Sequence, residues 1–298
     1  MVKKDGKQGK HRSDRALDIF LYVFSFLFVL VIVLPFIHLI ALSFNDGLDA
    51  LKGGIGLWPR KVTLENYKII LQEQSLLRAS LVSVARTVAG TFSSLVLTGL
   101  VAYCLTRREL VGRRFYLIVF LLPMYIGAGL IPTFLTYKAL HLTNSFAVYI
   151  IPNLVWAYNI IIIRTFFDSL PKALEESAIL DGANELQIFF KIYVPLSMPV
   201  IATIGLFNAV WQWNSWFDTV MYIRGNAWDT LSSLLAHMLM EQQTNFINDM
   251  KLAKRAVSLT PEVLKAAMTM VTVIPIMLVY PFLQKYFVKG VMIGAVKG

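Results

Sequence analysis

The stretch IFLYVFSFLFVLVIVLPFIHLIALSF, residues 19–44, decides the fold class of this chain, because its 26 residues include no Asp, Glu, Lys or Arg. A helix of about 20 residues, rising 1.5 Å per residue, crosses a hydrocarbon layer of about 30 Å. The hydrophobic part of a signal peptide is about 7–15 residues long, so we expect this longer run to be a retained membrane span. In lipid the backbone must satisfy its own hydrogen bonds, which leaves a helix or a closed barrel.

Five further apolar runs follow the first, and the composition of the whole chain agrees with them. Hydrophobic residues make up 57% of the chain and charged residues only 15%, against about 25% charged residues in soluble domains. The runs show no strict alternation of apolar and polar residues, which excludes a barrel. We therefore predict an all-α membrane protein with six transmembrane helices, at residues 19–44, 82–106, 115–137, 142–163, 192–217 and 266–284.

The basic residues predict the orientation in the membrane. With six spans, both termini and the loops 107–114 and 164–191 share one side, which carries 16 Lys and Arg in 68 residues, against 11 in 86 on the other side. Cytoplasmic segments are the ones enriched in Lys and Arg. The net charge of +10 thus reflects topology and attraction to anionic lipid rather than nucleic-acid binding. We expect a cytoplasmic basic tail (1–18), a cytoplasmic loop (164–191), a cytoplasmic C-terminal tail (285–298) and two long outer loops (45–78 and 218–265).

The polar stretch LPKALEESAILDGANELQIFFKIYVPLSMP, residues 170–199, separates the fourth and fifth apolar runs. Pro171 is tolerated in the first turn of a helix, residues 172–180 are good helix formers, and Asp181-Gly182 ends that helix. Asn184 with Gln187 three residues later has the pattern of a capping box that opens a second helix. The sequence therefore predicts a helix–turn–helix between two membrane spans.

The second predicted helix carries an apolar stripe. Leu186, Phe189, Phe190 and Tyr193 are spaced i, i+3, i+4, i+7, so they share one helix face that we expect to be buried. One interpretation is an ordinary interfacial helix that lies on the inner leaflet with its Phe side toward the lipid. The other is a handle that a soluble partner grips from the cytoplasm.

The second interpretation is favoured by a resemblance. Glu176-Ser177-Ala178 followed by Gly182 resembles the EAA signature of type I ABC-importer permeases, with Ser177 in place of the first alanine. Over nearly the whole chain the sequence is similar to the carbohydrate-uptake permeases related to the second permease of the maltose transporter, and within them to the branch that serves polysaccharide-derived oligosaccharides. The other matching stretches are residues 102–108, 127–132, 164–167, 213–217 and 280–298.

This resemblance implies a type I ABC-importer transmembrane domain whose loop 164–191, here called the EAA loop, inserts a coupling helix into a groove of a cytosolic ATPase. It implies a bacterial cell membrane, a second homologous permease as heterodimer partner, two cytosolic ATPase subunits, an extracellular solute-binding protein that meets the 218–265 loop, and an oligosaccharide substrate. It also places the C-terminal tail between the two ATPases. The coupling residues implied are Glu175, Glu176, Ser177, Ala178, Asp181, Gly182, Ala183 and Pro195.

The chain itself does not carry the ATPase. The sequence contains no G-x-x-x-x-G-K-[ST] phosphate-binding motif, so ATP must be bound by another polypeptide. We expect a transport subunit with no catalytic residues and no cofactor. Cys104 is the single cysteine and the four histidines are scattered, so no metal site is predicted either.

Aromatic and amide side chains in the fourth and fifth runs are candidates for a sugar path. Such a path needs aromatic faces for stacking against C–H groups and amides for hydroxyl groups. The alternatives are an aromatic belt at the membrane interface and, for Gln212 and Asn214, hydrogen bonds between helices. The candidate pathway residues are Arg86, Trp156, Asn159, Gln212, Trp213 and Asn214.

Arg86 is the one charge close to the centre of a span. An arginine at mid-bilayer costs roughly 2.5–3.5 kcal/mol on insertion scales. Because residues 87–106 can span alone, we expect Arg86 to extend to the outer interface. The alternative is a guanidinium that contacts an acidic sugar such as a uronate.

Two other classes of protein fit less well. A proton-coupled secondary carrier usually places Asp, Glu or His relays inside its spans, whereas here no carboxylate and only His38 falls within the six runs. The chain also lacks the internal repeat that is typical of such carriers. A membrane enzyme is disfavoured because the loops contain no nucleophile–base set.

Overall fold

The computed structural model describes residues 12–240 and 260–295. Within these residues the chain is helical, with one isolated antiparallel bridge between Asn45 and Val62. It divides into two compact units, one made of residues 1–70 and 243–270 and the other of residues 71–242 and 271–298.

The first unit contains the long helix α1 (Arg12–Ser43), followed by α2 (Gly47–Ala50) and α3 (Glu65–Gln72), which ends just inside the second unit. Residues Leu17–Ser43 of α1 are long and apolar enough to cross a membrane, and no part of their most apolar window is buried inside the protein. This agrees with a membrane span, as expected for the first apolar run.

Polar contacts hold the loop after α1 together. Asn45 is fully buried, and its Oδ1 accepts a hydrogen bond from the backbone N–H of Arg60 at 2.8 Å. The Asn66 amide donates to the backbone oxygens of Ser43 and Asn45, both at 2.9 Å. Asp49 accepts from the Asn45 amide and pairs with the Arg60 guanidinium at 3.0 Å, and these contacts, with the Asn45 bond the largest, lower the pKa of the Asp49 carboxyl. The loop thus has a core made of hydrogen bonds.

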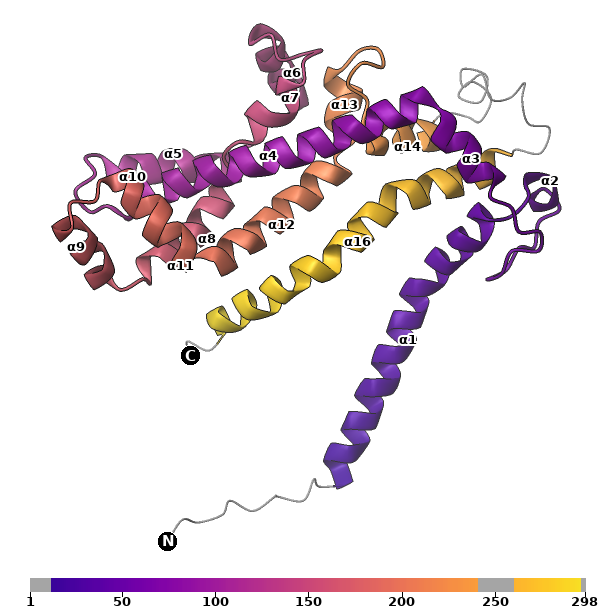
Figure 1. Cartoon of the computed structure of the whole chain (residues 1–298), viewed down its shortest axis with the longest axis horizontal. Coiled ribbons are helices and arrows are strands. Elements are labelled where there is room, and N and C mark those ends of the chain that lie inside the picture. The colour runs from indigo at the N-terminus through magenta and orange to yellow at the C-terminus, as the bar shows by residue number, and fades with distance from the viewer. Residues whose placement is uncertain (1–11, 241–259, 296–298) are drawn as a thin grey trace. The chain divides into compact units, whose positions relative to one another are not determined.

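The second unit is built around α4 (Gln74–Thr106), an uninterrupted helix of 33 residues. It packs against α8 (Ala157–Asp168) and α12 (Met198–Asn214), which run beside it (Figure 1). Gly90 and Gly99 lie where α4 meets its neighbours, and small residues are what allow membrane helices to approach closely.

The largest apolar cluster lies at the end of α4 that meets the EAA loop. It combines side chains of α4 and α8 with the helices after the EAA loop turn, α10 (Glu185–Ile188) and the π-helix η2 (Phe189–Tyr193). The aromatic rings touch edge to face, as in Phe167 with Tyr193 at 5.2 Å. The buried members are Ala102, Tyr103, Leu105, Ile160, Ile163, Phe167, Ile188, Phe189, Tyr193, Val200 and Ile204.

Several predicted spans are broken. The third run forms α5 (Arg113–Tyr125) and α6 (Leu130–Ala139), which are separated at Gly129, where φ is +80°. The fourth run forms α7 (Ala147–Ile150), the short 3-10 helix η1 (Ile151–Asn153) and α8, with a bend of 51°. Glycine and proline in these runs cause the breaks.

Helix length and hydropathy alone do not reach the predicted count of six spans. Within the described residues, three helices are long and apolar enough to cross a membrane, or up to five if each bent pair counts as one span. The second bent pair joins residues 185–196, which end in α11 (Val194–Leu196), to α12 at 84°. The predicted number of six spans is therefore not confirmed. In the part of the chain that the structure describes, the third apolar run is the one that yields no candidate span.

The second unit is completed by α13 (Phe217–Tyr222), α14 (Leu231–Met240) and the part of α16 (Pro261–Ala295) after residue 270. Helix α16 extends to Ala295, beyond the predicted end of the sixth span at residue 284. Residues 1–11 of the predicted basic tail, residues 241–259 of the second outer loop and residues 296–298 lie outside the described part of the chain.

Candidate functional site

The helix–turn–helix predicted for the EAA loop is confirmed. Helix α9 (Lys172–Leu180) begins after Pro171 and ends at Gly182, whose φ is +81°. The Ala183 N–H donates to the Ala178 carbonyl at 2.9 Å and the Gly182 N–H to the Ile179 carbonyl at 3.0 Å. This is a Schellman ending with glycine in its left-handed position. A Cβ at Gly182 would meet nothing within 4 Å, so glycine is required here for its backbone conformation.

The predicted capping box is also present at the start of α10. The Gln187 N–H donates to Asn184 Oδ1 and the Asn184 N–H donates to Gln187 Oε1, both at 2.9 Å. Each residue therefore satisfies a backbone donor that the helix start leaves unpaired. The Schellman ending and the box fix the direction in which the second helix leaves the turn.

The predicted burial of the apolar stripe is half right. Phe189 and Tyr193 are buried, but Leu186 is 60% exposed and Phe190 49% exposed. Ile188 is buried in place of Leu186, which means that the buried face is turned by about one residue from the predicted one. The π-helix over Phe189–Tyr193 departs from the 3.6-residue period on which the stripe rested.

Arg107, at the end of α4, holds both helices of the EAA loop. Its guanidinium forms ion pairs with Glu175 of α9 and with Glu185 of α10, the latter at 2.7 Å. It also donates to the Tyr103 hydroxyl and lies over the Tyr103 ring, 4.4 Å from its centroid. The hydroxyls of Tyr103 and Tyr193 donate to Glu185 and Glu175, each at 2.6 Å. Sequence reasoning missed Arg107, although its place directly after the predicted span 82–106 was a signal.

The two predicted coupling glutamates differ in their surroundings. Both were expected to face a partner, but the Glu175 carboxylate is turned toward Arg107 and Tyr193, and its side chain is only 16% exposed. Glu176 is exposed. Glu175 thus contacts the permease itself, and its coupling role stays a prediction. Of the other predicted coupling residues, Ser177, Asp181, Gly182 and Pro195 are exposed, and Ala178 and Ala183 are half-buried.

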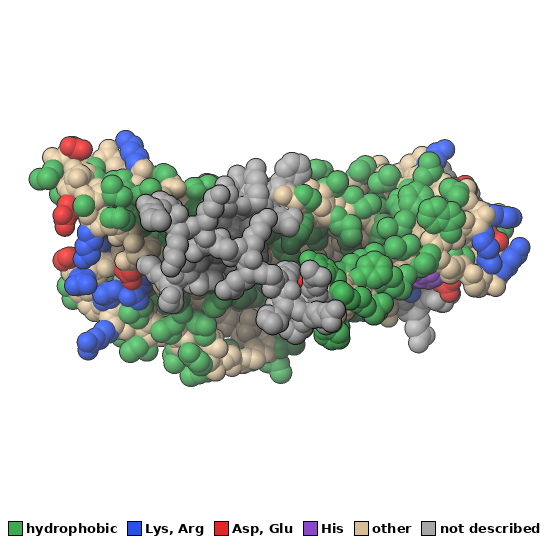
Figure 2. Space-filling model, turned by 90° about the horizontal axis from the view of Figure 1, so that it is seen from below, with side chains coloured by type: hydrophobic (Ala, Val, Ile, Leu, Met, Phe, Trp, Pro, Cys, Tyr) green, Lys and Arg blue, Asp and Glu red, His purple; other side chains and the backbone are tan. Residues whose placement is uncertain are grey.

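Charged side chains gather around this end of α4, in the part of the molecule that carries α9 and α10 (Figure 2). A cavity of about 210 Å³ opens here between the 107–109 loop, the end of α8 and α9. Exposed apolar side chains lie on the same loop: Leu174, Ile179, Leu180, Leu186 and Phe190. Leu180, at 89% exposed, has almost its whole side chain outside the protein. An exposed apolar patch rimmed by charge is typical of a docking surface.

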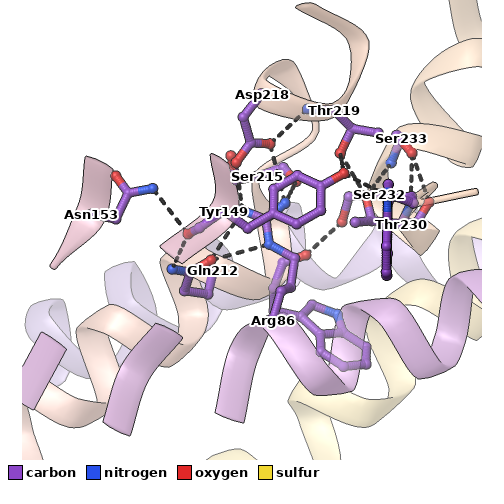
Figure 3. A network of polar contacts seen from close by, with 12 residues as sticks. Arg86, Tyr149, Asn153, Gln212, Ser215, Asp218, Thr219, Thr230, Ser232 and Ser233 are labelled. Atoms are coloured by element: carbon purple, nitrogen blue, oxygen red, sulfur yellow. Dashed lines mark hydrogen bonds and ion pairs between the residues drawn. The ribbon is translucent and has the colours of Figure 1, made fainter. Parts of the chain in front are cut away.

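Twelve residues after the start of α4, Arg86 is fully buried. Figure 3 shows the polar network around it. Its guanidinium pairs with the Asp218 carboxylate at 2.5 Å and donates to the Ser215 carbonyl at 3.1 Å. It also donates two hydrogen bonds to Gln212 Oε1, at 3.0 and 3.1 Å, and lies over the Tyr149 ring, 4.2 Å from the ring centroid. The prediction that Arg86 extends to the outer interface is wrong. Its donors find acceptors within the protein, which removes the need to reach water.

Three of the predicted pathway residues form hydrogen bonds between helices. Gln212 is buried and donates to the Tyr149 carbonyl at 3.1 Å, which agrees with the interhelical alternative. The Trp213 indole N–H donates to the Thr272 carbonyl of α16 at 3.0 Å. The Asn159 amide is buried and donates to Asn208 at 3.1 Å.

Trp156 and Asn214 are exposed, and they lie near an aromatic groove that the sequence reasoning did not define. Trp156 meets Trp211 edge to face at 5.4 Å. Asn214 lies one helical turn after Trp211 on the same face of α12, so the period of α12 was the signal that could have found Trp211. The groove has a volume of about 630 Å³ and is lined by Leu206, Phe207, Val210, Trp211, Asn214, Ser215, Trp216, Phe217 and Tyr280.

Comparison with known proteins decides the family. Residues 94–293 match the family described as "Binding-protein-dependent transport system inner membrane component". The chain belongs to this family. This permease is therefore a multi-pass component of a membrane transport system and not an enzyme. An ion-gradient-driven carrier, the alternative weighed from the sequence, is not favoured.

Two curated relatives cover nearly the whole permease. The polygalacturonan/rhamnogalacturonan transport system permease protein YtcP of Bacillus subtilis (strain 168) is 40% identical over 286 residues, 96% of this chain and all of the relative. The arabinooligosaccharides transport system permease protein AraQ of Halalkalibacterium halodurans is 30% identical over 284 residues, 93% of this chain and 96% of the relative.

Solved structures agree with this assignment. A chain in the crystal structure of a bacterial ABC transporter involved in the import of the acidic polysaccharide alginate superposes with a TM-score of 0.86 at 30% identity, covering 94% of this permease and all of that chain. A chain in the bacterial alginate ABC transporter in complex with an alginate pentasaccharide-bound periplasmic protein has a TM-score of 0.58 at 15% identity, which shows a shared fold alone. The fold is that of an ABC-importer transmembrane domain.

Proposed function

We propose that this permease is one of two transmembrane subunits of an ATP-driven importer of oligosaccharides released from polysaccharides, including acidic ones. The names of its relatives support this substrate class, since they transport polygalacturonan, rhamnogalacturonan and arabinooligosaccharides. Its partners are a homologous permease, two cytosolic ATPases and an extracellular solute-binding protein. Both termini lie in the cytoplasm, in agreement with the distribution of Lys and Arg.

The observation that carries this proposal is the exposed surface of the EAA loop. A helix–turn–helix with fixed ends presents Glu176 and five exposed apolar side chains beside a charged cavity, in a chain whose sequence lacks a nucleotide-binding motif. Full burial of a Leu, Ile or Phe side chain stabilises an assembly by about 1.5–3 kcal/mol. Docking of α9 on the ATPase uses these side chains and Glu176, while Glu175, Ala178 and Ala183 hold α9 against the permease. Closure of the ATPases thus moves the loop as a rigid lever.

The sugar path runs along the aromatic groove of α12. Trp211, Phe217 and Tyr280 offer flat faces for sugar rings, and the Asn214 amide serves hydroxyl groups. Trp156 supports Trp211 from α8. The helices that carry the groove are held together by the hydrogen bonds of Asn159, Gln212 and Trp213. Arg86 contributes to the same packing through its bonds to Gln212. A uronate contact by Arg86 is disfavoured because its guanidinium is buried and paired.

Reconstitution of both permeases and the ATPases in vesicles, with the binding protein added, tests the proposal. Uptake of labelled galacturonate and arabinose oligosaccharides is measured with the binding protein outside, with ATP inside, and with an ionophore present to remove ion gradients. We expect uptake that requires ATP and the binding protein and is insensitive to the ionophore. Uptake that the ionophore abolishes, or that proceeds without ATP, contradicts the proposal.

A further inference from the structure

We infer that α4 is a strut held by an arginine at two places, by Arg107 at its C-terminal end to the EAA loop and by Arg86, twelve residues after its start, to the segment of α13 and α14 (residues 217–240), so that the two segments move as one body. Its use in transport rests on the proposed function. The mechanical link itself rests on the contacts alone and is tested separately below.

The strut is one continuous helix. Helix α4 has 33 residues and no proline inside it, which gives a length of about 50 Å. Arg86 and Arg107 are 21 residues apart, or about 32 Å along the helix, close to the thickness of a hydrocarbon layer. Proline is the commonest cause of a sharp kink, so α4 has little freedom to bend between the two clamps.

The inner clamp joins α4 to both helices of the EAA loop at once. Arg107 pairs with Glu175 of α9 and with Glu185 of α10, and Tyr103, one turn earlier on α4, donates a second hydrogen bond to Glu185. Beneath these polar groups the Tyr103 ring packs 4.9 Å from Tyr193. The EAA loop therefore cannot shift relative to α4 without breaking charged and aromatic contacts together.

The second clamp joins α4 to α13 and α14. Arg86 binds Asp218 in the first turn of α13 through two nitrogens, at 2.5 and 3.1 Å (Figure 3). One turn earlier, the Ser83 hydroxyl accepts the N–H of Leu231, the first residue of α14, at 2.9 Å. Val82 packs in an apolar cluster with Tyr222 at the end of α13.

Along the chain itself, the EAA loop reaches α13 only through joints. Residues 185–196 meet α12 at an angle of 84°, and α12 ends at Ser215, whose backbone is extended before α13 begins. A jointed path transmits force poorly, because each joint absorbs a change of angle. Helix α4 contacts the segments on either side of both joints. Its contacts through Arg107 and Arg86 therefore connect the EAA loop to α13 and α14 without passing through the joints.

Amide hydrogen exchange in the assembled transporter tests the strut. Neutralising one clamp by Arg107→Gln should speed exchange at least threefold in residues 217–240, which contact α4 about 32 Å away along the helix. Asp218→Asn should do the same in residues 172–188. A change that stays at the mutated end in both variants overturns the inference, because a purely local contact has no long-range effect.

One control variant and one replacement variant complete this test. Arg164→Gln removes an ion pair with Asp168 on α8 (3.4 Å), close to the EAA loop but not between α4 and that loop, and should leave residues 217–240 unchanged. Should Asp218→Asn fail to assemble, Arg86→Gln with Asp218→Asn removes both charges without leaving one buried alone, and the same exchange in residues 172–188 is measured.

A second readout separates the strut from the proposed function. With the binding protein added, each clamp variant should show at least threefold less stimulation of ATP hydrolysis than the wild type. A variant that combines both clamp substitutions should lose no more stimulation than either single variant. Additive losses overturn the strut even where uptake is intact. If the wild-type complex shows no ATP-driven uptake, the proposed function is wrong. The exchange experiment still shows whether α4 links the two segments.

Discussion

Gly90 of α4 and Gln212 of α12 lie so close that a Cβ on Gly90 would fall 2.3 Å from Gln212 Nε2. Gln212 in turn accepts hydrogen bonds from Arg86 and donates to the Tyr149 carbonyl. The absence of a side chain at Gly90 is therefore what allows the buried network to form.

Gly90→Ala should destabilise the permease by about 1–3 kcal/mol, because the added methyl group displaces the Gln212 amide and weakens its bonds. Thermal unfolding of the purified complex measures this as a lower Tm. Gly127→Ala is the matched control, since a Cβ at Gly127 meets nothing within 4 Å and its φ is not positive. An unchanged Tm for Gly90→Ala contradicts the close approach.

Gly182→Glu should abolish uptake while the protein still inserts in the membrane. Most residues other than glycine are strained at φ +81°, and a charged side chain also stands on the proposed docking surface. Gly182→Asn should keep most of the activity, since asparagine tolerates the left-handed region. Uptake in vesicles and pull-down of the ATPase measure both effects. Normal ATPase assembly and uptake by Gly182→Glu would rule out the docking role of the loop.

Arg86→Gln should lower the free energy of unfolding by about 3–5 kcal/mol, because it leaves the Asp218 carboxylate without its buried partner. The double variant Arg86→Gln with Asp218→Asn should recover a large part of that loss. The ratio of acidic to neutral oligosaccharide uptake should stay at the wild-type value in any variant that assembles. A selective loss of acidic substrate in Arg86→Gln would instead restore a direct uronate contact.

Local patterns predicted the EAA loop well, because its signals are short-range. Pro171, the Asp181-Gly182 pair and the Asn184/Gln187 box each act within one turn of helix, and each is found where the sequence placed it. The same reasoning failed for Leu186 and Phe190, since a π-helix after residue 188 depends on what packs against it.

Pairings between distant residues could not be predicted from one sequence. Arg86 meets Asp218 across 132 positions, and Arg107 meets Glu185 across 78. Insertion costs indicated that Arg86 needs water or a partner, but they did not identify Asp218. Similarly, hydropathy found the apolar runs but could not tell a continuous span from a helix broken at Gly129.

Asp49 should make the loop after α1 sensitive to acid. Hydrogen bonding from Asn45 and pairing with Arg60 lower the pKa of this carboxyl, so its stabilising contribution is present above the unfolded value of about 3.9 and is lost as pH falls through the lower folded value. Asp49→Asn should lower Tm at neutral pH and reduce the fall in Tm below about pH 4. An equal acid dependence in both proteins would mean that other carboxylates dominate.

Trp211 and Trp213 are neighbours in sequence but face different surroundings, which makes them a matched pair for the sugar path. The Trp211 side chain is 39% exposed in the groove, whereas the Trp213 indole is bonded to the Thr272 carbonyl. Trp211→Ala should raise the KM of uptake about tenfold or more with little change in Tm, because a stacking face for the sugar is lost. Trp213→Ala should mainly lower Tm, by opening a cavity against α16. If both variants lower Tm equally and leave KM unchanged, Trp211 packs against a partner subunit and the groove is an interface between permeases.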